Sequence, residues 1–182
     1  MTCIVGIVEK DKVYIGGDSA ASSSCDLTVM ANPKVFILQD RFIIGYTTSF
    51  RMGQIIEHEL TVSKHPENMS LYKFMTTVFV NDLRECLKRQ GWAEREKDRE
   101  SGGTFLIGYQ GRLFVIQDDY AVLESADNYS AVGSGWSFAL GSLFTSTGSA
   151  KKRIDNALQS AEKHCPSVRG PFTTLYLKGE KQ

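Results

Sequence analysis

The sequence predicts an α+β protein in which two β-sheets are stacked between layers of helices. Short β patterns occupy the first quarter of the chain, and amphipathic helical patterns follow them. Strands and then helices come a second time before a final strand. No repeat, low-complexity stretch or composition break divides the 182 residues, so we expect one domain, 1–182.

Two hairpins open the chain. Apolar and β-branched residues predict strands at Cys3–Val8 and Val13–Gly17, with a charged turn between them. The small polar residues of Ser19–Ser24 are interpreted as a loop. Two further strands, at Lys34–Leu38 and Phe42–Tyr46, form the second hairpin.

Two helices are predicted next. Apolar residues recur at helical spacing over about 49–63. A longer helix extends to Leu87, with Asn68 or Ser70 as its N-terminal cap. Its apolar stripe is typical of a helix face buried in a core, and we assign it no cofactor role.

A charged segment separates these helices from a second set of strands. The run Glu94–Glu100 alternates in sign, which is typical of a solvated loop or helix end rather than a binding patch. Strands are then predicted at Thr104–Tyr109, Leu113–Ile116 and Ala121–Leu123.

The last third of the chain predicts two more helices and one strand. The segment Ser130–Gly135 leads into a helix at Ser137–Phe144. A fourth helix covers Ala150 to about Lys163, and the final strand is Phe172–Leu177.

The net charge and the cysteine content exclude several classes of partner and site. With 21 basic and 21 acidic residues, the formal net charge is zero, so we expect neither a nucleic acid nor a membrane as partner. The four cysteines form no Cys-x-x-Cys pair, and we predict no zinc site, no other metal and no cofactor. The N-terminus lacks the pattern of a signal peptide, so the cytoplasm is the expected location.

The first two residues could provide a catalytic nucleophile and its base. Removal of Met1 would give Thr2 a nucleophilic hydroxyl and a free α-amine on the same residue. That pair is a self-contained nucleophile and base. Cys3 is a weaker alternative, because strand alternation turns it away from Thr2 and free cysteines are usually buried.

An aspartate and a lysine follow at equal intervals. Asp18 lies sixteen residues after Thr2 at the end of a predicted strand, and Lys34 opens another strand sixteen residues later. The ends of neighbouring strands can converge beside the N-terminus. From spacing alone, Asp18 as a turn residue and Lys34 as an edge-strand charge stay open as alternatives.

The chemistry would explain each residue type. An α-amine has a reference pKa of about 7.7–8.0, much closer to neutrality than a lysine side chain at about 10.4. A cationic Lys34 would favour the neutral, proton-accepting amine and would stabilise negative charge on the Thr2 oxygen. Asp18 would keep Lys34 charged and oriented. Backbone N–H groups of Thr47–Ser49 could receive the developing oxyanion.

These residues together resemble the proteasome β-subunit and HslV peptidase family. The resemblance rests on Thr2, Gly16–Asp18, Lys34–Val35, the strand-to-helix turn after Gly45, and Gly133–Gly135, and it covers almost the whole chain. It implies a four-layer αββα sandwich of two antiparallel sheets between helical layers, the N-terminal nucleophile hydrolase fold.

The resemblance also implies roles for these residues. Thr2 would be the catalytic nucleophile, with its own amine as the general base. Lys34 would activate it and Asp18 would hold Lys34. Ser134 would form a hydrogen bond near the amine, supported by the backbone of Gly135.

Two departures from the family pattern stand out. Thr48, whose N–H would lie in the oxyanion hole, stands where the family usually has glycine, so the backbone there loses glycine's freedom. The segment Cys165–Gly170 lacks an aspartate that the proteasome uses, which favours the HslV side. Ser167 is a candidate for a supporting role in that segment.

By the same resemblance, Ala21, Asn32, Tyr46 and Phe50 would line the pocket for the residue before the cut. None of the four is charged, so we predict a preference for uncharged side chains.

The leading hypothesis is a threonine-type endopeptidase of a self-compartmentalising homo-oligomeric ring. It would act on peptides or unfolded proteins, with an ATPase unfoldase as a partner implied by the resemblance. The alternatives are a free-standing amidase acting on small amides, and a non-catalytic ring subunit or scaffold if Met1 is retained.

Overall fold

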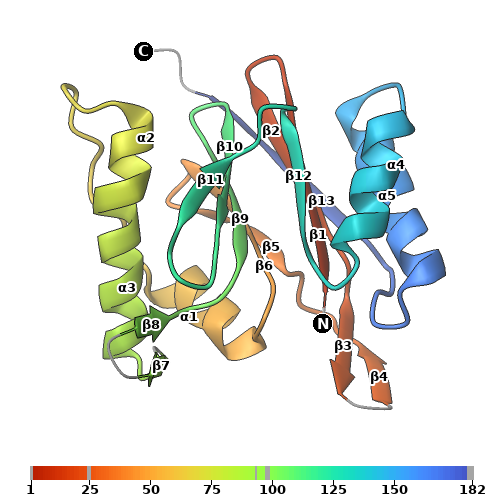
Figure 1. The fold of residues 1–182 in the computed structure, drawn as a ribbon, viewed down its shortest axis with the longest axis horizontal. Coiled ribbons are helices and arrows are strands. Elements are labelled where there is room, and N and C mark those ends of the chain that lie inside the picture. Colours follow the sequence, from red (N-terminus) through yellow and green to blue (C-terminus); the bar gives the residue numbers. More distant parts are fainter. Residues whose placement is uncertain (1, 24–25, 93, 97–98, 180–182) are drawn as a thin grey trace.

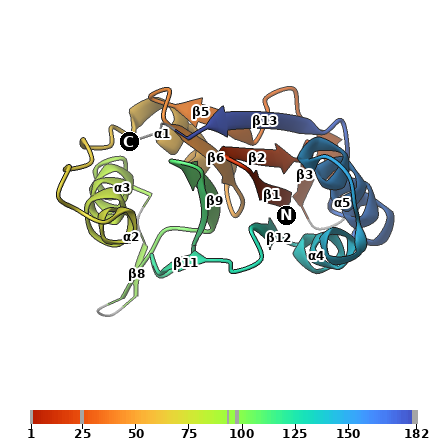
Figure 2. The same ribbon diagram turned by 90° about the horizontal axis from the view of Figure 1, so that it is seen from above.

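Two sheets lie face to face between helices in the computed structural model, which describes residues 2–23, 26–92, 94–96 and 99–179 (Figure 1). Met1, on which the N-terminal chemistry depends, lies outside the described residues. Figure 2 shows the four layers from above, with helices on both outer sides of the paired sheets. The αββα sandwich expected from the sequence is confirmed.

The first sheet contains the first and the last strand of the chain, in the order β12–β1–β2–β13. Its strands are β1 (Cys3–Glu9), β2 (Lys12–Gly17), β12 (Tyr129–Gly133) and β13 (Thr173–Lys178). The second sheet has the order β11–β10–β9–β6–β5. Its strands are β5 (Val35–Leu38), β6 (Phe42–Tyr46), β9 (Phe105–Tyr109), β10 (Arg112–Ile116) and β11 (Val122–Glu124). All pairings in both sheets are antiparallel.

Strand β1 is apolar at successive positions because both of its faces are buried. Ile4 packs between the two sheets with Ile15 and Ile43. Cys3 and Val5 point the other way, into a core beneath the helices that cover this sheet. A strand covered on both sides has no polar face, which explains the continuous run.

Helices cover each outer face. The first sheet is covered by α4 (Trp136–Thr145) and α5 (Ala150–His164). The second is covered by α1 (Phe50–Glu59), α2 (Leu71–Phe74), the π-helical segment η1 (Met75–Phe79) and α3 (Val80–Arg89). Ser49, Ser70 and Ser149 cap helices by accepting a backbone N–H. None of the helices described is long and apolar enough to cross a membrane.

Three segments differ from the sequence prediction. The expected loop Ser19–Ser24 contains β3 (Ala20–Ser23), which pairs with β4 (Asp26–Val29) in a hairpin that extends from the body (Figure 1). In the charged run, residues 97 and 98 lie outside the described part of the chain; the described residues form a strand pair rather than a loop or helix end, because β7 (Glu94–Glu96) pairs with β8 (Arg99–Ser101). The segment before α4 is strand β12 rather than a simple lead-in. None of these segments has the apolar alternation that identifies a strand in sequence.

Candidate active site around Thr2

A buried ion pair lies beside the start of the chain. Lys34 Nζ is 2.8 Å from Asp18 Oδ1, and both side chains are essentially inaccessible, at 1% and 0% exposure. Lys34 also donates to the carbonyl of Ala20 at 2.6 Å. Burial lowers the pKa of Lys34, and the adjacent Asp18 carboxylate opposes that shift. The two residues are therefore neither a turn aspartate nor an edge-strand charge.

The Asp18 carboxylate is satisfied by backbone donors as well as by Lys34. Its Oδ1 accepts from the N–H of Cys3 at 3.0 Å, and its Oδ2 accepts from the N–H of Ala20 at 3.0 Å. A longer bond of 3.4 Å comes from the N–H of Arg169. Because Cys3 follows Thr2 directly, these bonds position Thr2 next to the ion pair.

Ser134 forms two hydrogen bonds with the backbone of Thr2. The Thr2 nitrogen donates to Ser134 Oγ at 3.2 Å, and the Ser134 hydroxyl donates to the Thr2 carbonyl at 3.2 Å. The N–H of Gly135 reaches the same carbonyl at 3.4 Å. Ser167 lies 2.9 Å from Ser134, oxygen to oxygen, and is buried. The sequence prediction thus named both serines of this network.

Cys165 completes this network and was not among the predicted site residues. Its Sγ lies 3.2 Å from Ser167 Oγ and 3.7 Å from Ser134 Oγ. Burial alone would raise the pKa of the thiol, but the hydrogen bonds with Ser167 and Ser134 outweigh it and lower the pKa. In Cys3, by contrast, burial and then Asp18 raise the pKa to about 12. No spacing in the sequence distinguishes these two cysteines.

Thr48 occupies the turn between β6 and α1 with a left-handed backbone, φ +68°. That region disfavours a β-branched residue, and glycine adopts it readily. The Thr48 hydroxyl accepts from the N–H of Thr104 at 3.3 Å. Thr47 is bonded to the carbonyl of Thr104 through both its N–H and its hydroxyl. These threonine contacts hold the turn in a conformation that the residue type by itself resists.

The predicted pocket residues divide between two adjoining cavities. A cavity of about 510 Å³ is lined by Thr2, Lys34 and Thr48 together with Ala21, Tyr46 and Phe50. The neighbouring cavity, of about 750 Å³, shares the last three residues and adds Asn32. Charged side chains also line them: Asp26 and Arg51 line the first, and Arg51, Glu57 and Glu59 line the second. The lining is thus more polar than the four predicted residues indicated.

Gly133 allows β12 to approach the start of the chain. It has a φ of +92°, and a Cβ at this position would lie only 2.2 Å from the Thr2 carbonyl oxygen. No side chain other than hydrogen fits there. Over the described part of the chain, no group of three or more His, Cys, Asp or Glu side chains is arranged to hold a metal ion.

Comparison with solved structures shows the fold. A Thiobacillus denitrificans BPH structure, in complex with epoxomicin, superposes with a TM-score of 0.81 at 18% identity, over 99% of this chain and 100% of that one. The eukaryotic HslV of Trypanosoma brucei gives 0.70 at 17%, over 97% and 99%. Anbu, an ancestral β-subunit from Yersinia bercovieri, gives 0.70 at 14%, over 97% and 82%. The chain therefore has the proteasome-like N-terminal nucleophile hydrolase fold.

Sequence comparisons add little. No protein-family model matches the chain. A stretch of 68 residues is 38% identical to the uncharacterized protein U55B of human herpesvirus 7 (strain JI), over 37% of this chain. The match spans 15% of the length of that viral protein. It carries no functional assignment.

Proposed function

We propose that this protein is a threonine-type endopeptidase that cleaves peptide bonds with Thr2 after removal of Met1. The arrangement around Thr2 carries the proposal. The Thr2 nitrogen donates a hydrogen bond to Ser134, and Thr2 and the buried Lys34 line the same cavity. The fold shared with the BPH, HslV and Anbu structures supports it.

The proposed reaction begins at the Thr2 hydroxyl. Its proton passes to the free α-amine as Oγ attacks the substrate carbonyl carbon, and the N–H of Thr48 receives the oxyanion. The amine then delivers that proton to the leaving nitrogen as the C–N bond breaks, which leaves an ester on Thr2. Water attacks the ester, giving one proton to the amine and releasing the carboxylic acid, and the Thr2 oxygen regains its proton.

The Lys34–Asp18 pair supplies the electrostatics of this step. A cation near the α-amine disfavours its protonated form, so more of the amine is available as a base near neutrality. The same cation stabilises the developing alkoxide on Thr2. Asp18 keeps Lys34 in place, and burial strengthens each interaction because water screens it less.

The proposal includes assembly and partners. We infer a cytoplasmic homo-oligomeric ring that encloses its active sites, takes peptides or unfolded proteins as substrates, and receives them from an ATPase unfoldase. In the cavity beside Thr2 we infer a preference for an uncharged side chain before the cut, because Ala21, Tyr46 and Phe50 are uncharged and the lining charges Asp26 and Arg51 have opposite signs. Equal cleavage of peptides with acidic and apolar residues at that position would contradict this preference.

Mass mapping tests the catalytic claim. The purified protein is weighed intact, treated with a peptide epoxyketone, digested and mapped. We expect the loss of one methionine and a single adduct on Thr2. Thr2→Ala should abolish both the adduct and peptide hydrolysis, and Thr2→Ser, which keeps the hydroxyl, should retain the adduct.

The same experiment separates the alternatives. Full retention of Met1 with no adduct would indicate a scaffold subunit. An adduct on Thr2 in a protein that cleaves small amides but no peptide would indicate a free-standing amidase. Undiminished peptide hydrolysis by Thr2→Ala would refute the mechanism.

A further inference from the structure

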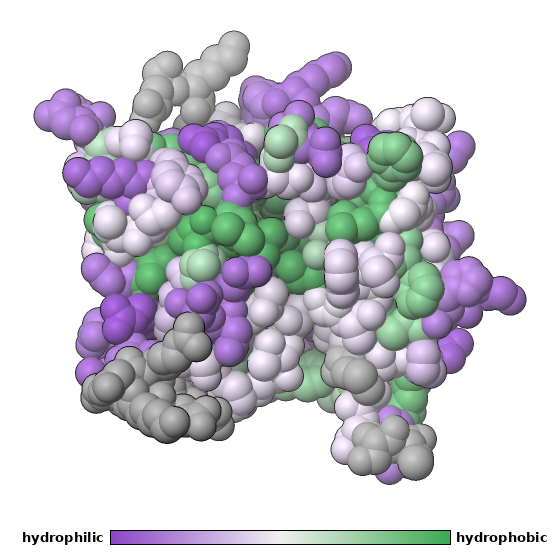
Figure 3. Space-filling view, viewed as in Figure 1, coloured by the Kyte–Doolittle hydropathy of each residue, from purple (hydrophilic) through white to green (hydrophobic). Residues whose placement is uncertain are grey.

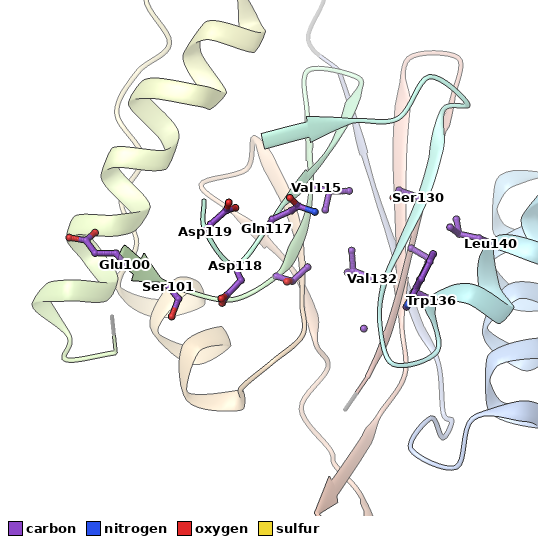
Figure 4. A pocket seen from close by; sticks show the side chains of 13 residues that line it. Glu100, Ser101, Val115, Gln117, Asp118, Asp119, Ser130, Val132, Trp136 and Leu140 are labelled. Carbon is purple, nitrogen blue, oxygen red and sulfur yellow. The ribbon is translucent and has the colours of Figure 1, made fainter. Parts of the chain in front are cut away.

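A further large cavity, besides the two described above, is lined by residues that contact the Thr2 region. It has a volume of about 800 Å³ and lies between β10 with the loop that follows it, β12 and α4. Its apolar part comprises Val115, Val132, Trp136 and Leu140, and two carboxylates, Asp118 and Asp119, stand at its edge (Figure 4). Figure 3 shows apolar side chains gathered in a hollow near the middle of this face.

This cavity borders the residues that hold Thr2. Gly133 lines it, and the Gly133 α-carbon lies against the Thr2 carbonyl. Thr104 lines it as well and is hydrogen-bonded to Thr47 and Thr48, which line the 510 Å³ cavity. The linings of the two cavities are therefore connected through hydrogen-bonded threonines.

The chemistry of the proposed reaction indicates which part of the substrate lies in each of the two cavities. The leaving nitrogen must come close to the Thr2 amine, because that amine delivers its proton. The Thr2 nitrogen is hydrogen-bonded to Ser134. Ser134 directly follows Gly133, which lines the 800 Å³ cavity. Thr2 itself and Lys34 line the 510 Å³ cavity, so the acyl side of the substrate occupies that cavity. The chain that leaves should therefore run toward the larger cavity.

We propose that the 800 Å³ cavity binds the substrate segment that follows the cut and selects a basic side chain next to a large apolar one. The inference rests on the proposed function and adds a second specificity site to it. The volume is that of a typical ligand pocket and accommodates two or three side chains.

The charge of the lining favours a basic segment. Asp118 and Asp119 are exposed at the edge, and the third carboxylate, Glu100, forms an ion pair with Arg84 at 2.7 Å. Among the described residues that line the cavity, none is lysine or arginine. A carboxylate pair without a lining cation attracts a basic side chain and repels an acidic one.

The apolar part of the lining favours a bulky neighbour. Trp136 is 51% exposed and is the first residue of α4. It directly follows Gly135, whose N–H is hydrogen-bonded to the Thr2 carbonyl. An exposed indole offers a wide flat face for an aliphatic or aromatic side chain. Val132 and Leu140 continue that surface into the cavity.

Peptides that differ only after the cut test this inference. Internally quenched peptides share the residues before the cut and carry Lys-Leu or Glu-Leu after it, and mass spectrometry verifies the cleaved bond. A short reporter whose leaving group is a fluorescent amine has no residues there. The readout is the kcat/KM of each long peptide divided by that of the reporter, for the wild type and the variants.

We expect the Lys-Leu ratio to exceed the Glu-Leu ratio by about fivefold in the wild type, consistent with two partly exposed charge pairs. Asp118→Asn with Asp119→Asn should bring the two ratios within about twofold of each other. Trp136→Ala should lower both ratios by about threefold. The matched controls Asp127→Asn and Tyr72→Ala, at exposed positions outside the cavity, should keep the wild-type ratios.

Each other outcome decides against a specific claim. Turnover with equal Lys-Leu and Glu-Leu ratios, or ratios that the cavity variants leave unchanged, would overturn this inference and leave the proposed function intact. A drop in particle mass by light scattering in the cavity variants, with unchanged ratios, would assign the surface to contacts between copies instead. Absence of both turnover and a Thr2 adduct would refute the proposed function, and this inference with it.

Discussion

At the scale of single residues, the Lys34–Asp18 pair dominates the energetics of the site. Both charges are removed from water, and their cost is offset by one another and by the backbone donors around Asp18. Lys34→Ala should lower the free energy of unfolding by about 3 kcal/mol, because it leaves a buried carboxylate without its cation. Urea denaturation measures the loss.

The matched control for that prediction is the double variant Lys34→Met with Asp18→Asn. It removes both charges and keeps most of the buried volume, so it should be more stable than Lys34→Ala. A single variant as stable as the wild type would contradict the burial of the pair.

Thr48 provides a test of backbone strain. Its φ of +68° costs an L-residue about 1 kcal/mol or more. Thr48→Ala should destabilise the protein, since it keeps the strain and loses the bond to the N–H of Thr104. Thr48→Gly should be about 1 kcal/mol more stable than Thr48→Ala by chemical denaturation. Equal stabilities would show that the turn is not strained.

Tyr46 contributes to the alkaline stability of the protein through its buried hydroxyl. Burial, and then Glu57, raise the pKa of Tyr46 from 10.0 to about 12. The unfolded chain releases the Tyr46 proton at lower pH than the folded protein. The contribution of Tyr46 to the free energy of unfolding is therefore complete below pH 10 and is lost as pH rises toward 12. The wild type should lose about 2 kcal/mol more than Tyr46→Phe across that range. Parallel curves of unfolding free energy against pH would contradict this.

At the scale of elements, small residues determine how closely helices and sheets pack. A Cβ on Gly16 of β2 would lie 2.4 Å from Ile154 Cγ2 of α5. Gly16→Ala should therefore cost about 1–3 kcal/mol through overpacking. In an Ile154→Ala background the same change should cost much less, and thermal denaturation of the four proteins of this cycle measures the coupling. Additive effects would show that α5 shifts freely.

The elements also differ in how far sequence predicts them. Strands β1, β2, β5 and β6 and the four main helical regions follow from apolar periodicity and from serine caps. Strand β12 is short and contains Ser130 and Gly133, and it exists because β1 offers it backbone partners. The hairpins β3–β4 and β7–β8 are likewise held by backbone pairing between their strands.

At the scale of the whole molecule, helix α4 exposes more apolar surface than a monomer needs. Phe138 is 40% exposed and Phe144 is 81% exposed. Such residues are typical of contacts between copies. If the proposed ring forms through this helix, light scattering should give a multiple of 20.3 kDa for the wild type, and Phe144→Asp should shift the population toward 20.3 kDa. An unchanged particle mass would place the contact elsewhere.

The site itself was predicted in part. Thr2, Asp18, Lys34 and Ser134 were named from residue type, spacing and family resemblance, and the structure brings them together. Cys165 was not among them, because nothing in its neighbourhood distinguishes a thiol bonded to two serines from an ordinary buried cysteine. The catalytic roles of those four residues stay predictions.

The sequence by itself determined the strands and helices with strong periodicity and the residue types from which the site is built. These are local properties, readable from spacing and from the chemistry of each side chain. The order of the elements indicated two sheets between helical layers. Only the tertiary structure decided that Ser134 and Ser167 meet beside Thr2, that Lys34 is buried against Asp18, and that a further cavity adjoins Gly133. Those contacts join residues that are distant in sequence, and they arise because the two sheets and their helices pack against one another.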